Sequence, residues 1–246
     1  VTALMGGAAR AQLAPTDPLC EDSLDAYRQC AREWLADCDG TVQLNLRHQH
    51  TRLGKRLLAH GMAPSPPKNA SEDLPEVLRQ IIAEGVQVRK MDGVLIGRNG
   101  QTSPKFFFGF IDGAAVGALA AWTLAGECLA LADERPGEEV TVFLVSPGQA
   151  ATFRDERVML SEYVAHLALV LSSLRQHGHR LTLQVLGDAA GGIYVALAAP
   201  AARVVASTGA KVQVLPPAAI ARVLRRQSEL AGVEDYVRAG VIDTLV

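Results

Sequence analysis

The chain has 246 residues and a formal net charge of −2, with charged side chains at 20% of its positions. Hydrophobic residues make up 49%, so the composition indicates one large folded domain or two small ones and excludes a disordered polymer. A chain without a basic excess and with 5% aromatic residues is poorly suited to neutralise phosphates or to stack on bases. We therefore expect no nucleic-acid partner.

The most apolar stretch, residues 114–132, is about long enough to span a bilayer. It consists mostly of Ala and Gly and contains Glu127, so we interpret it as a buried helix and expect no membrane partner. The chain does not open with a cationic segment followed by a Leu-rich core, and its four cysteines do not make a disulfide framework. These features favour a cytoplasmic protein with reduced thiols.

Three elements are predicted early in the chain: a helix over 23–38, a strand over 41–46 and a short helix over 51–61 that Gly61 ends. The run 63–73 is rich in Pro, Ser and Asn and is the best candidate linker. It divides the chain into a predicted N-terminal appendage, residues 1–73, and a main domain, residues 74–246.

The cysteines of the appendage, Cys20, Cys30 and Cys38, contain no C-x-x-C pair. Their spacing fits no standard zinc pattern, even if His48 and His50 are added as ligands. The sequence therefore predicts no metal site.

After the linker the sequence predicts a helix over 74–85 and then short strands, which Asp92–Gly93 and Asn99–Gly100 interrupt as in a β-hairpin meander. An Ala-rich helix follows from about Gly113. Two continuous apolar runs, residues 140–145 and 181–186, are typical of strands that are covered on both faces.

The remaining predicted elements alternate between helix and strand. They are a long helix (154–178), a tight turn (187–192), a short helix (193–201), two strands (203–207 and 211–215), a helix (216–227) and a final helix with an extended tail (231–246). Such alternation predicts an α/β fold with a mainly parallel inner sheet.

The junction LGDAAGGIYVALAA, residues 186–199, joins a buried strand to a helix through a Gly-rich segment. Backbone N–H groups at a helix start are unpaired and carry partial positive charge. Because Gly191 and Gly192 lack side chains, a substrate oxygen can approach their amides, which makes them candidates for an oxyanion hole that stabilises a thioester enolate. Alternatively, these glycines only allow the helix to pack closely on the sheet.

A second strand end lies in VFLVSPGQAATFRDE, where Pro147–Gly148 form a turn and Asp155 and Glu156 suit a helix start. Strand ends from consecutive βα units lie side by side at the carboxyl edge of a parallel sheet, where open α/β sheets bind ligands. Candidate substrate-binding residues at this edge are Gly148, Gln149 and Ala190. The alternative is that both segments are ordinary βα loops.

Other polar residues favour structural roles. We interpret His166 as a packing or surface histidine, and His177 and His179 as groups at a helix C-terminus. Three arginines (Arg222, Arg225 and Arg226) form a basic edge that is either simply solvated or a dock for phosphopantetheine or an acidic carrier protein.

Four segments, read in order, resemble the crotonase-type carboxyltransferase family, and most closely the gamma subunit of biotin-independent malonate decarboxylase: VSPGQAATFRDER, LRQHGH, LQVLGDAAGGIYVALAAPAARVVA and PAAIARVL. The resemblance runs from about Gly109 to Val246. It implies a crotonase-like spiral of ββα units with a backbone oxyanion hole at Gly191 and Gly192. The closing AGVEDYVRAGVIDTLV resembles acetyl-CoA carboxylase carboxyltransferase beta subunits, so residues 1–73 are interpreted as a zinc-ribbon remnant without its metal.

The resemblance implies a subunit of a decarboxylase that acts on a malonyl-type thioester. The acyl group is expected on phosphopantetheine of CoA or an acyl carrier protein, with no tightly bound cofactor and with a homologous crotonase-fold partner subunit. One alternative is the carboxyltransferase subunit of a biotin-dependent acyl-CoA carboxylase, with biotin on another protein because this chain has no Met-Lys-Met sequence. Another is a non-catalytic scaffold. The SPGQA turn favours the decarboxylase.

Overall fold

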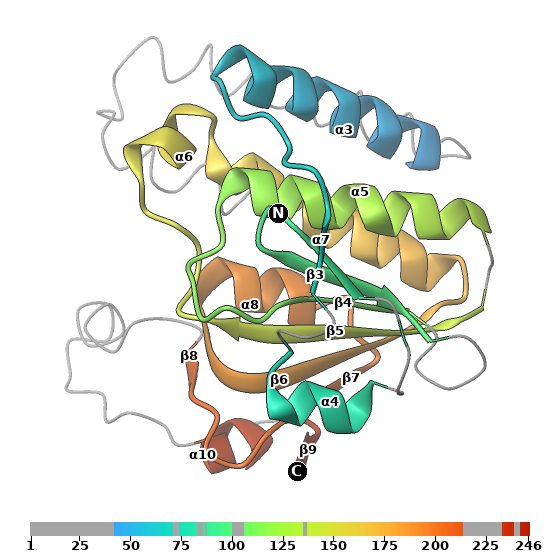
Figure 1. Cartoon of the computed structure of the whole chain (residues 1–246). Coiled ribbons are helices and arrows are strands. Elements are labelled where there is room, and N and C mark those ends of the chain that lie inside the picture. Colours follow the sequence, from blue (N-terminus) through green and yellow to red (C-terminus); the bar gives the residue numbers. More distant parts are fainter. Residues whose placement is uncertain are drawn as a thin grey trace, which may run out of the picture.

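The computed structural model describes residues 42–70, 74–82, 86, 88–99, 106–134, 137–213, 233–238 and 242–246. These residues form a β-sheet with helices on both faces (Figure 1). The sheet has the strand order β1-β2-β3-β4-β5-β6-β7-β9, with β8 paired to β6. The strands are β1 (Lys68–Asn69), β2 (Val88–Met91), β3 (Val94–Arg98), β4 (Phe106–Phe110), β5 (Glu139–Ser146), β6 (Arg180–Ala190), β7 (Arg203–Ala206), β8 (Val212–Gln213) and β9 (Thr244–Leu245).

Strands β1 to β4 form the antiparallel half of the sheet. Between β2 and β3 the chain turns at Asp92 and Gly93, whose φ angles are +52° and +81°. A two-residue hairpin loop with positive φ at both positions strongly prefers Asp-Gly, which is the physical reason for this turn. The turn predicted at Asp92–Gly93 is confirmed, whereas Gly100 of the turn predicted at Asn99–Gly100 lies outside the described residues.

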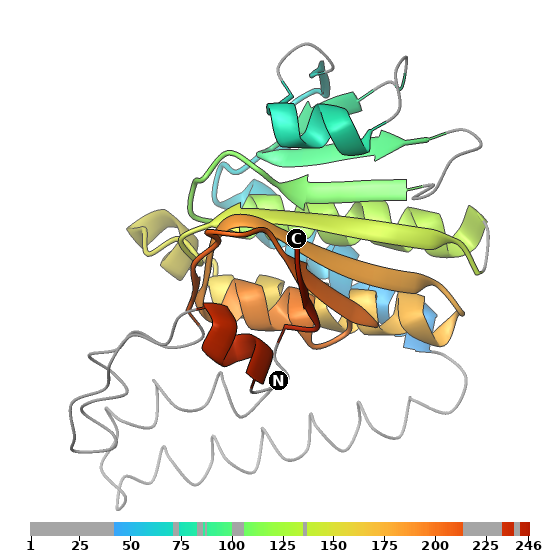
Figure 2. The ribbon, with the colours of Figure 1, turned by 90° about the horizontal axis from the view of Figure 1, so that it is seen from below.

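The parallel half follows the order of the chain, from β4 through β5 and β6 to β7 (Figure 2). Each crossover advances by one strand in the same direction, and crossovers of this kind are right-handed. Their helices therefore lie on one face: α5 (Ala118–Glu134), α7 (Leu160–Gln176) and α8 (Gly191–Ala198). Helices α4 (Glu76–Ile81) and α10 (Val233–Arg238) lie on the other face.

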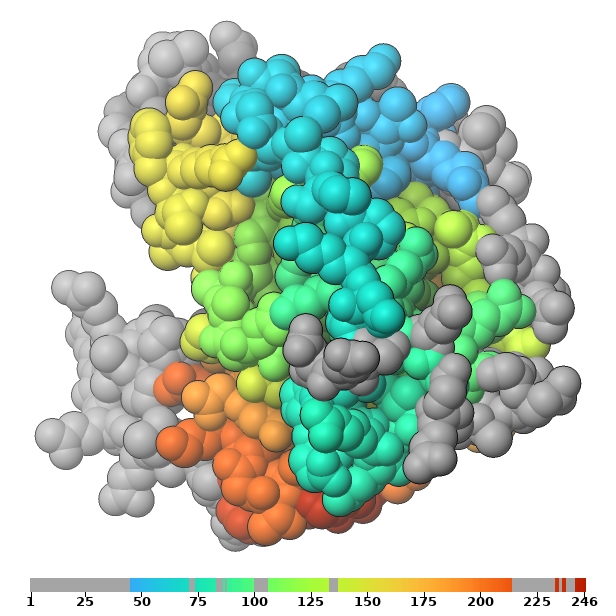
Figure 3. Space-filling view, viewed as in Figure 1, coloured from blue at the N-terminus to red at the C-terminus, as the bar shows by residue number. Residues whose placement is uncertain are grey.

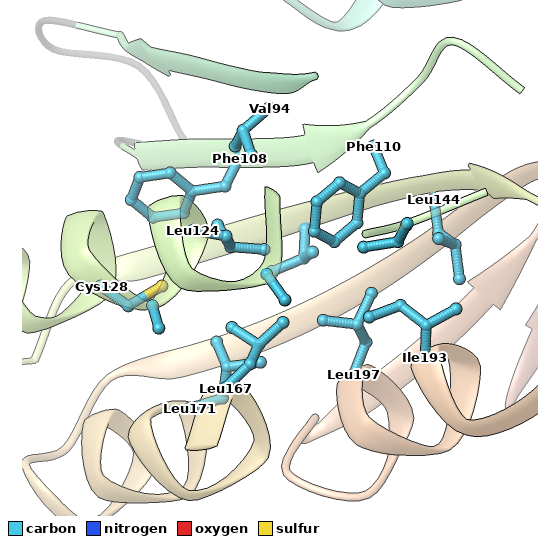
Figure 4. Packing of buried hydrophobic residues seen from close by; sticks show 14 of the residues in the cluster. Val94, Phe108, Phe110, Leu124, Cys128, Leu144, Leu167, Leu171, Ile193 and Leu197 are labelled. Atoms are coloured by element: carbon cyan, nitrogen blue, oxygen red, sulfur yellow. The ribbon is translucent and has the colours of Figure 1, made fainter. Parts of the chain in front are cut away.

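Both faces of the central strands are buried. In β5, Val142 and Leu144 belong to the large hydrophobic cluster under α5, α7 and α8, whereas Phe143 belongs to a smaller cluster with Leu78 of α4 and Phe107 of β4. Figure 4 shows the large cluster between the sheet and these helices. Burial of each such side chain contributes about 1.5–3 kcal/mol, and burial on both faces explains the continuous apolar runs.

Helix α3 (Val42–Ala59) corrects the predicted strand over 41–46. The short alternation in TVQLNL is overridden by an apolar stripe at helical spacing, because Leu46, Leu53 and Leu57 pack into the large cluster. The helix ends before Gly61, whose φ is +69°, as expected. The described part of the predicted appendage therefore packs on the main core, and the division of the chain at residue 73 stays a prediction.

Two further expectations are corrected. The helix predicted over 154–178 is two helices, α6 (Phe153–Arg157) and α7, because Met159 adopts a left-handed φ of +62° between them. The predicted tight turn over 187–192 does not form: β6 continues to Ala190, and α8 starts at Gly191. The helices predicted over 23–38 and 216–227 lie outside the described residues. Among the helices that the structure describes, none combines the length and apolar character needed to cross a bilayer.

A chain of polar side chains links α3 to α7. The Nδ1 atom of His166 lies 3.3 Å from Oε1 of Gln49, and its Nε2 atom lies 3.3 Å from Nδ1 of His50. The His50 ring also stacks on Trp122, with ring centroids 4.5 Å apart. Burial lowers the pKa of both rings, so both are neutral at neutral pH. Because the Gln49 oxygen only accepts, the neutral His166 donates from Nδ1 and accepts at Nε2, and His50 donates to it from Nδ1.

Acid is expected to destabilise this fold through the two histidines. Burial lowers the pKa of His50 to about 4 and that of His166 to about 3. The unfolded chain therefore binds more protons below pH 6.5, and stability falls as the pH drops from 6.5 towards 4. At pH 5 the loss approaches about 2 kcal/mol for the buried His166. It is smaller for the half-buried His50, whose charge the solvent screens.

The melting temperature at pH 7 and pH 5 measures this effect. The double variant His50→Gln/His166→Gln should lose less on acidification than the wild type. His60→Gln is the matched control, because the His60 ring bonds the Arg56 carbonyl at the exposed end of α3. An equal decrease in the double variant and the wild type would assign the acid sensitivity to other groups.

Candidate functional site

The carboxyl ends of the parallel strands continue into a second set of pairings. After Leu144↔Val185 the β5–β6 register shifts, and Ser146 pairs with Ala189. Ala189 in turn pairs with Val212 of β8, and Val116 forms a bridge with Gln149. The strand ends therefore make additional pairings with β8 and with Val116, at the edge of the sheet where α6, α8 and β8 lie in Figure 1.

These additional pairings bring together the residues predicted from two strand ends. A Cβ atom at Gly148 would lie 3.4 Å from the carbonyl oxygen of Ala190. The Val116 N–H donates to the Gly148 carbonyl at 2.9 Å, and the Ala150 N–H donates to the Val116 carbonyl at 2.9 Å, so the backbone of Gly148 and Gln149 is fixed on both sides. The strand-end argument thus predicted the proximity correctly, and the roles of these residues remain a prediction.

The start of α8 is capped by a side chain from the other loop. The Gly192 N–H donates to Oε1 of Gln149 at 2.9 Å, and this hydrogen bond lies at the surface. Ala190, the residue before the helix, provides no side-chain cap. Gly191 has a φ of +65°, and a Cβ atom there would lie 2.7 Å from the same Gln149 oxygen. The absence of side chains at 191 and 192 therefore creates a position where one oxygen atom contacts a backbone amide.

Ser146 shapes the turn that carries Gln149, and sequence reasoning missed it. Its side chain is fully buried, and its Oγ atom lies 2.8 Å from the Ala114 carbonyl and 3.0 Å from the Gly148 carbonyl. The same atom accepts the Gly148 N–H at 3.2 Å. These contacts hold Gly148 at a φ of +129°, which favours glycine. The sequence signal for this role was a serine directly after the apolar run 140–145.

Asp155 couples α6 to the start of α5. Its buried carboxylate accepts the Ala118 N–H at 2.8 Å and the Thr152 hydroxyl at 2.5 Å. In return, Thr152 Oγ1 accepts the Asp155 N–H at 3.1 Å and caps α6. The sequence suggested a helix-start role for Asp155, but the structure shows that it serves two helices.

The histidines considered from the sequence have structural surroundings. His166 is buried in the hydrogen-bond chain of α3 and α7. The His177 ring bonds the Ser173 carbonyl at 2.7 Å, which confirms its position at the end of α7, and His179 contacts the Glu138 carbonyl. No group of three or more His, Cys, Asp or Glu side chains within the described ranges could hold a metal ion. Cys20, Cys30, Cys38 and the Arg222–Arg226 edge lie outside those ranges.

Alanine at Asp155 is expected to destabilise the fold by about 1–3 kcal/mol, because it removes a charge-assisted bond to a buried amide and part of a helix cap. The free energy of unfolding in urea measures the loss. Glu156→Ala, at the exposed neighbouring position, is the control and should change stability by no more than about 0.5 kcal/mol. Equal effects at the two positions would show that the cap contributes little.

Comparisons with known proteins agree with this architecture. A family model described as the malonate decarboxylase gamma subunit matches residues 112–244, which is more than half of the chain. A comparison with curated protein sequences finds no match.

Three solved structures from Pseudomonas malonate decarboxylase are similar to this chain, each at 21% identity. The MdcD-MdcE hetero-dimer has a TM-score of 0.54 over 63% of this chain and 71% of that one. A hetero-tetramer in complex with coenzyme A has a TM-score of 0.50 over 63% and 70%. A hetero-tetramer in complex with malonate has a TM-score of 0.50 over 79% and 76%. These likenesses confirm the expected crotonase-type fold.

Proposed function

This chain belongs to the malonate decarboxylase gamma-subunit family, and from that premise we propose that it is a subunit of a biotin-independent decarboxylase acting on a malonyl-type thioester. The observation that carries the proposal is the hydrogen bond from the Gly192 N–H to a carbonyl oxygen at the surface. It supports a role for the start of α8 in holding a substrate oxygen. The motifs that resemble the malonate decarboxylase gamma subunit and the family match both support this class of reaction.

The chemistry requires stabilisation of an enolate. The bond between the α-carbon and the carboxyl carbon breaks and CO2 leaves. The electron pair moves into the thioester, whose oxygen becomes negatively charged, and protonation of the α-carbon then gives an acetyl-type thioester. A preorganised N–H at a helix start stabilises such an oxygen more in the transition state than in the ground state. In the proposal Gly191 and Gly192 bind this oxygen, and Gly148, Gln149 and Ala190 border the substrate.

The proposed substrate carrier is phosphopantetheine, on CoA or on an acyl carrier protein. The coenzyme A bound to the Pseudomonas hetero-tetramer supports a thioester of this type. The same decarboxylase was solved as a hetero-dimer and as hetero-tetramers, which supports a homologous partner subunit for this chain. The proposal is tested by purifying the chain with its partners and measuring CO2 release from a malonyl thioester.

Turnover by this complex should not depend on biotin. Avidin binds any biotinylated partner and would stop a carboxyltransferase that works with carboxybiotin, so it separates the proposed decarboxylase from the alternative. We expect CO2 release to be the same with and without avidin. Complete inhibition, relieved by free biotin, would support the biotin-dependent carboxyltransferase instead. If the partner subunits still turn over malonyl thioester without this chain, the chain is a non-catalytic scaffold.

Gly191→Ala is expected to lower kcat by about 10²–10³, the usual effect of losing one oxyanion donor. The reason is steric, because the new Cβ atom would lie 2.7 Å from the oxygen position. At Gly192 the corresponding distance is 3.5 Å, so Gly192→Ala should lose less.

Gly178→Ala controls for backbone strain in Gly191→Ala. Gly178 has a similar left-handed φ of +86° and no contact closer than 3.8 Å, and it lies at the other end of the sheet, before β6. Both variants should lose melting temperature, but Gly178→Ala should keep turnover for each folded complex. Near-full turnover in Gly191→Ala would exclude the start of α8 as the oxyanion site.

A further inference from the structure

The side-chain oxygen of Gln149 occupies the position beside the Gly192 N–H where the substrate oxygen is proposed to bind. Its Oε1 atom must be the one that faces Gly192, because a backbone N–H is a donor and the NH2 group of glutamine cannot accept. The atom that now lies at the proposed oxyanion position is therefore a neutral carbonyl oxygen from the chain's own Gln149 side chain.

The Gln149 side chain can move away from Gly192 while the Gln149 backbone stays in place. The backbone of Gln149 bridges to Val116, and the adjoining hydrogen bonds at Gly148 and Ala150 are each 2.9 Å long. The Gln149 side chain is exposed. An exposed hydrogen bond between neutral groups contributes little net free energy, so a competing ligand can displace it.

We propose that Gln149 is an internal occupant of the oxyanion position, which the thioester oxygen displaces when the substrate binds. The inference rests on the proposed function, because it assigns Gln149 a role at the same amide. A neutral thioester oxygen and a neutral carboxamide oxygen are similar acceptors, so they compete in the ground state. An enolate oxygen is a stronger acceptor, because hydrogen bonds to ionised groups are about twice as strong. Because the Gln149–Gly192 bond must break before either the substrate or the transition state can bind, it weakens both by the same amount relative to the free enzyme. It therefore raises KM and leaves kcat unchanged.

Two substitutions at Gln149 should shift KM in opposite directions. Gln149→Ala removes the occupant, so KM for the malonyl thioester should fall by about two- to tenfold, the value of one neutral hydrogen bond, with kcat kept. Gln149→Glu places a carboxylate at the amide, and its charge-assisted bond should raise KM. Gln176→Glu makes the same chemical change at an exposed position at the far end of α7 and should leave KM unchanged.

The kinetics of the purified complex distinguish this inference from the proposed function. If the wild-type complex does not turn over malonyl thioester, the proposed function is wrong. If it does, a higher KM or a lower kcat in Gln149→Ala would show that the Gln149 side chain binds substrate directly, and the inference would be overturned. Unchanged kinetics in both Gln149 variants would overturn it as well. Equal melting temperatures of the variants and the wild type show that folding does not cause the differences.

Discussion

The register shift between β5 and β6 is the constraint on which the candidate site depends. Between the pairs Leu144↔Val185 and Ser146↔Ala189, β6 uses more residues than β5, so β6 bends out of the main sheet. Its end can then pair with β8, and the loop after β5 can pair with Val116. Without this bend the Gly191–Gly192 segment would continue along the sheet and would not lie beside Gln149. One irregularity in the pairing of β5 and β6 thus brings the two strand ends of the candidate site together.

Elements with strong hydrophobic periodicity, or with clear turn and helix-end residues, could be predicted from the sequence. The apolar runs of β5 and β6, the Asp92–Gly93 hairpin and the glycine at the end of α7 each follow from a local physical rule. The rest depends on tertiary contacts. The left-handed Met159, which divides α6 from α7, has no local signal, because such a conformation in a non-glycine residue persists only where the surroundings impose it.

The segment GDAAGG illustrates the same limit within the site. Its glycines are typical of a turn, yet they serve a bent strand in which a Cβ atom at Gly187 would lie 3.1 Å from Val145. The proximity of the two strand ends was predictable, because consecutive parallel strands end at one edge. The contact between Gln149 and Gly192 was not, since it joins residues 43 positions apart through one side-chain conformation. The sequence indicated a helix start at Asp155, but its bond to the Ala118 N–H and the contacts of Ser146 with the Ala114 and Gly148 carbonyls were visible only in three dimensions.

The proposed site is built from backbone amides, which explains why titratable side chains are poor guides to it. An amide N–H keeps its proton at all physiological pH values, so it can hold an oxygen without a perturbed pKa. The strongly perturbed histidines, His50 and His166, instead lie among α3, α5 and α7, where they join helices. Among the described residues these two histidines thus concern stability, whereas the proposed site relies on the fixed dipole of the α8 amides. A glycine pair at a strand-to-helix junction is therefore the more informative feature of such a sequence.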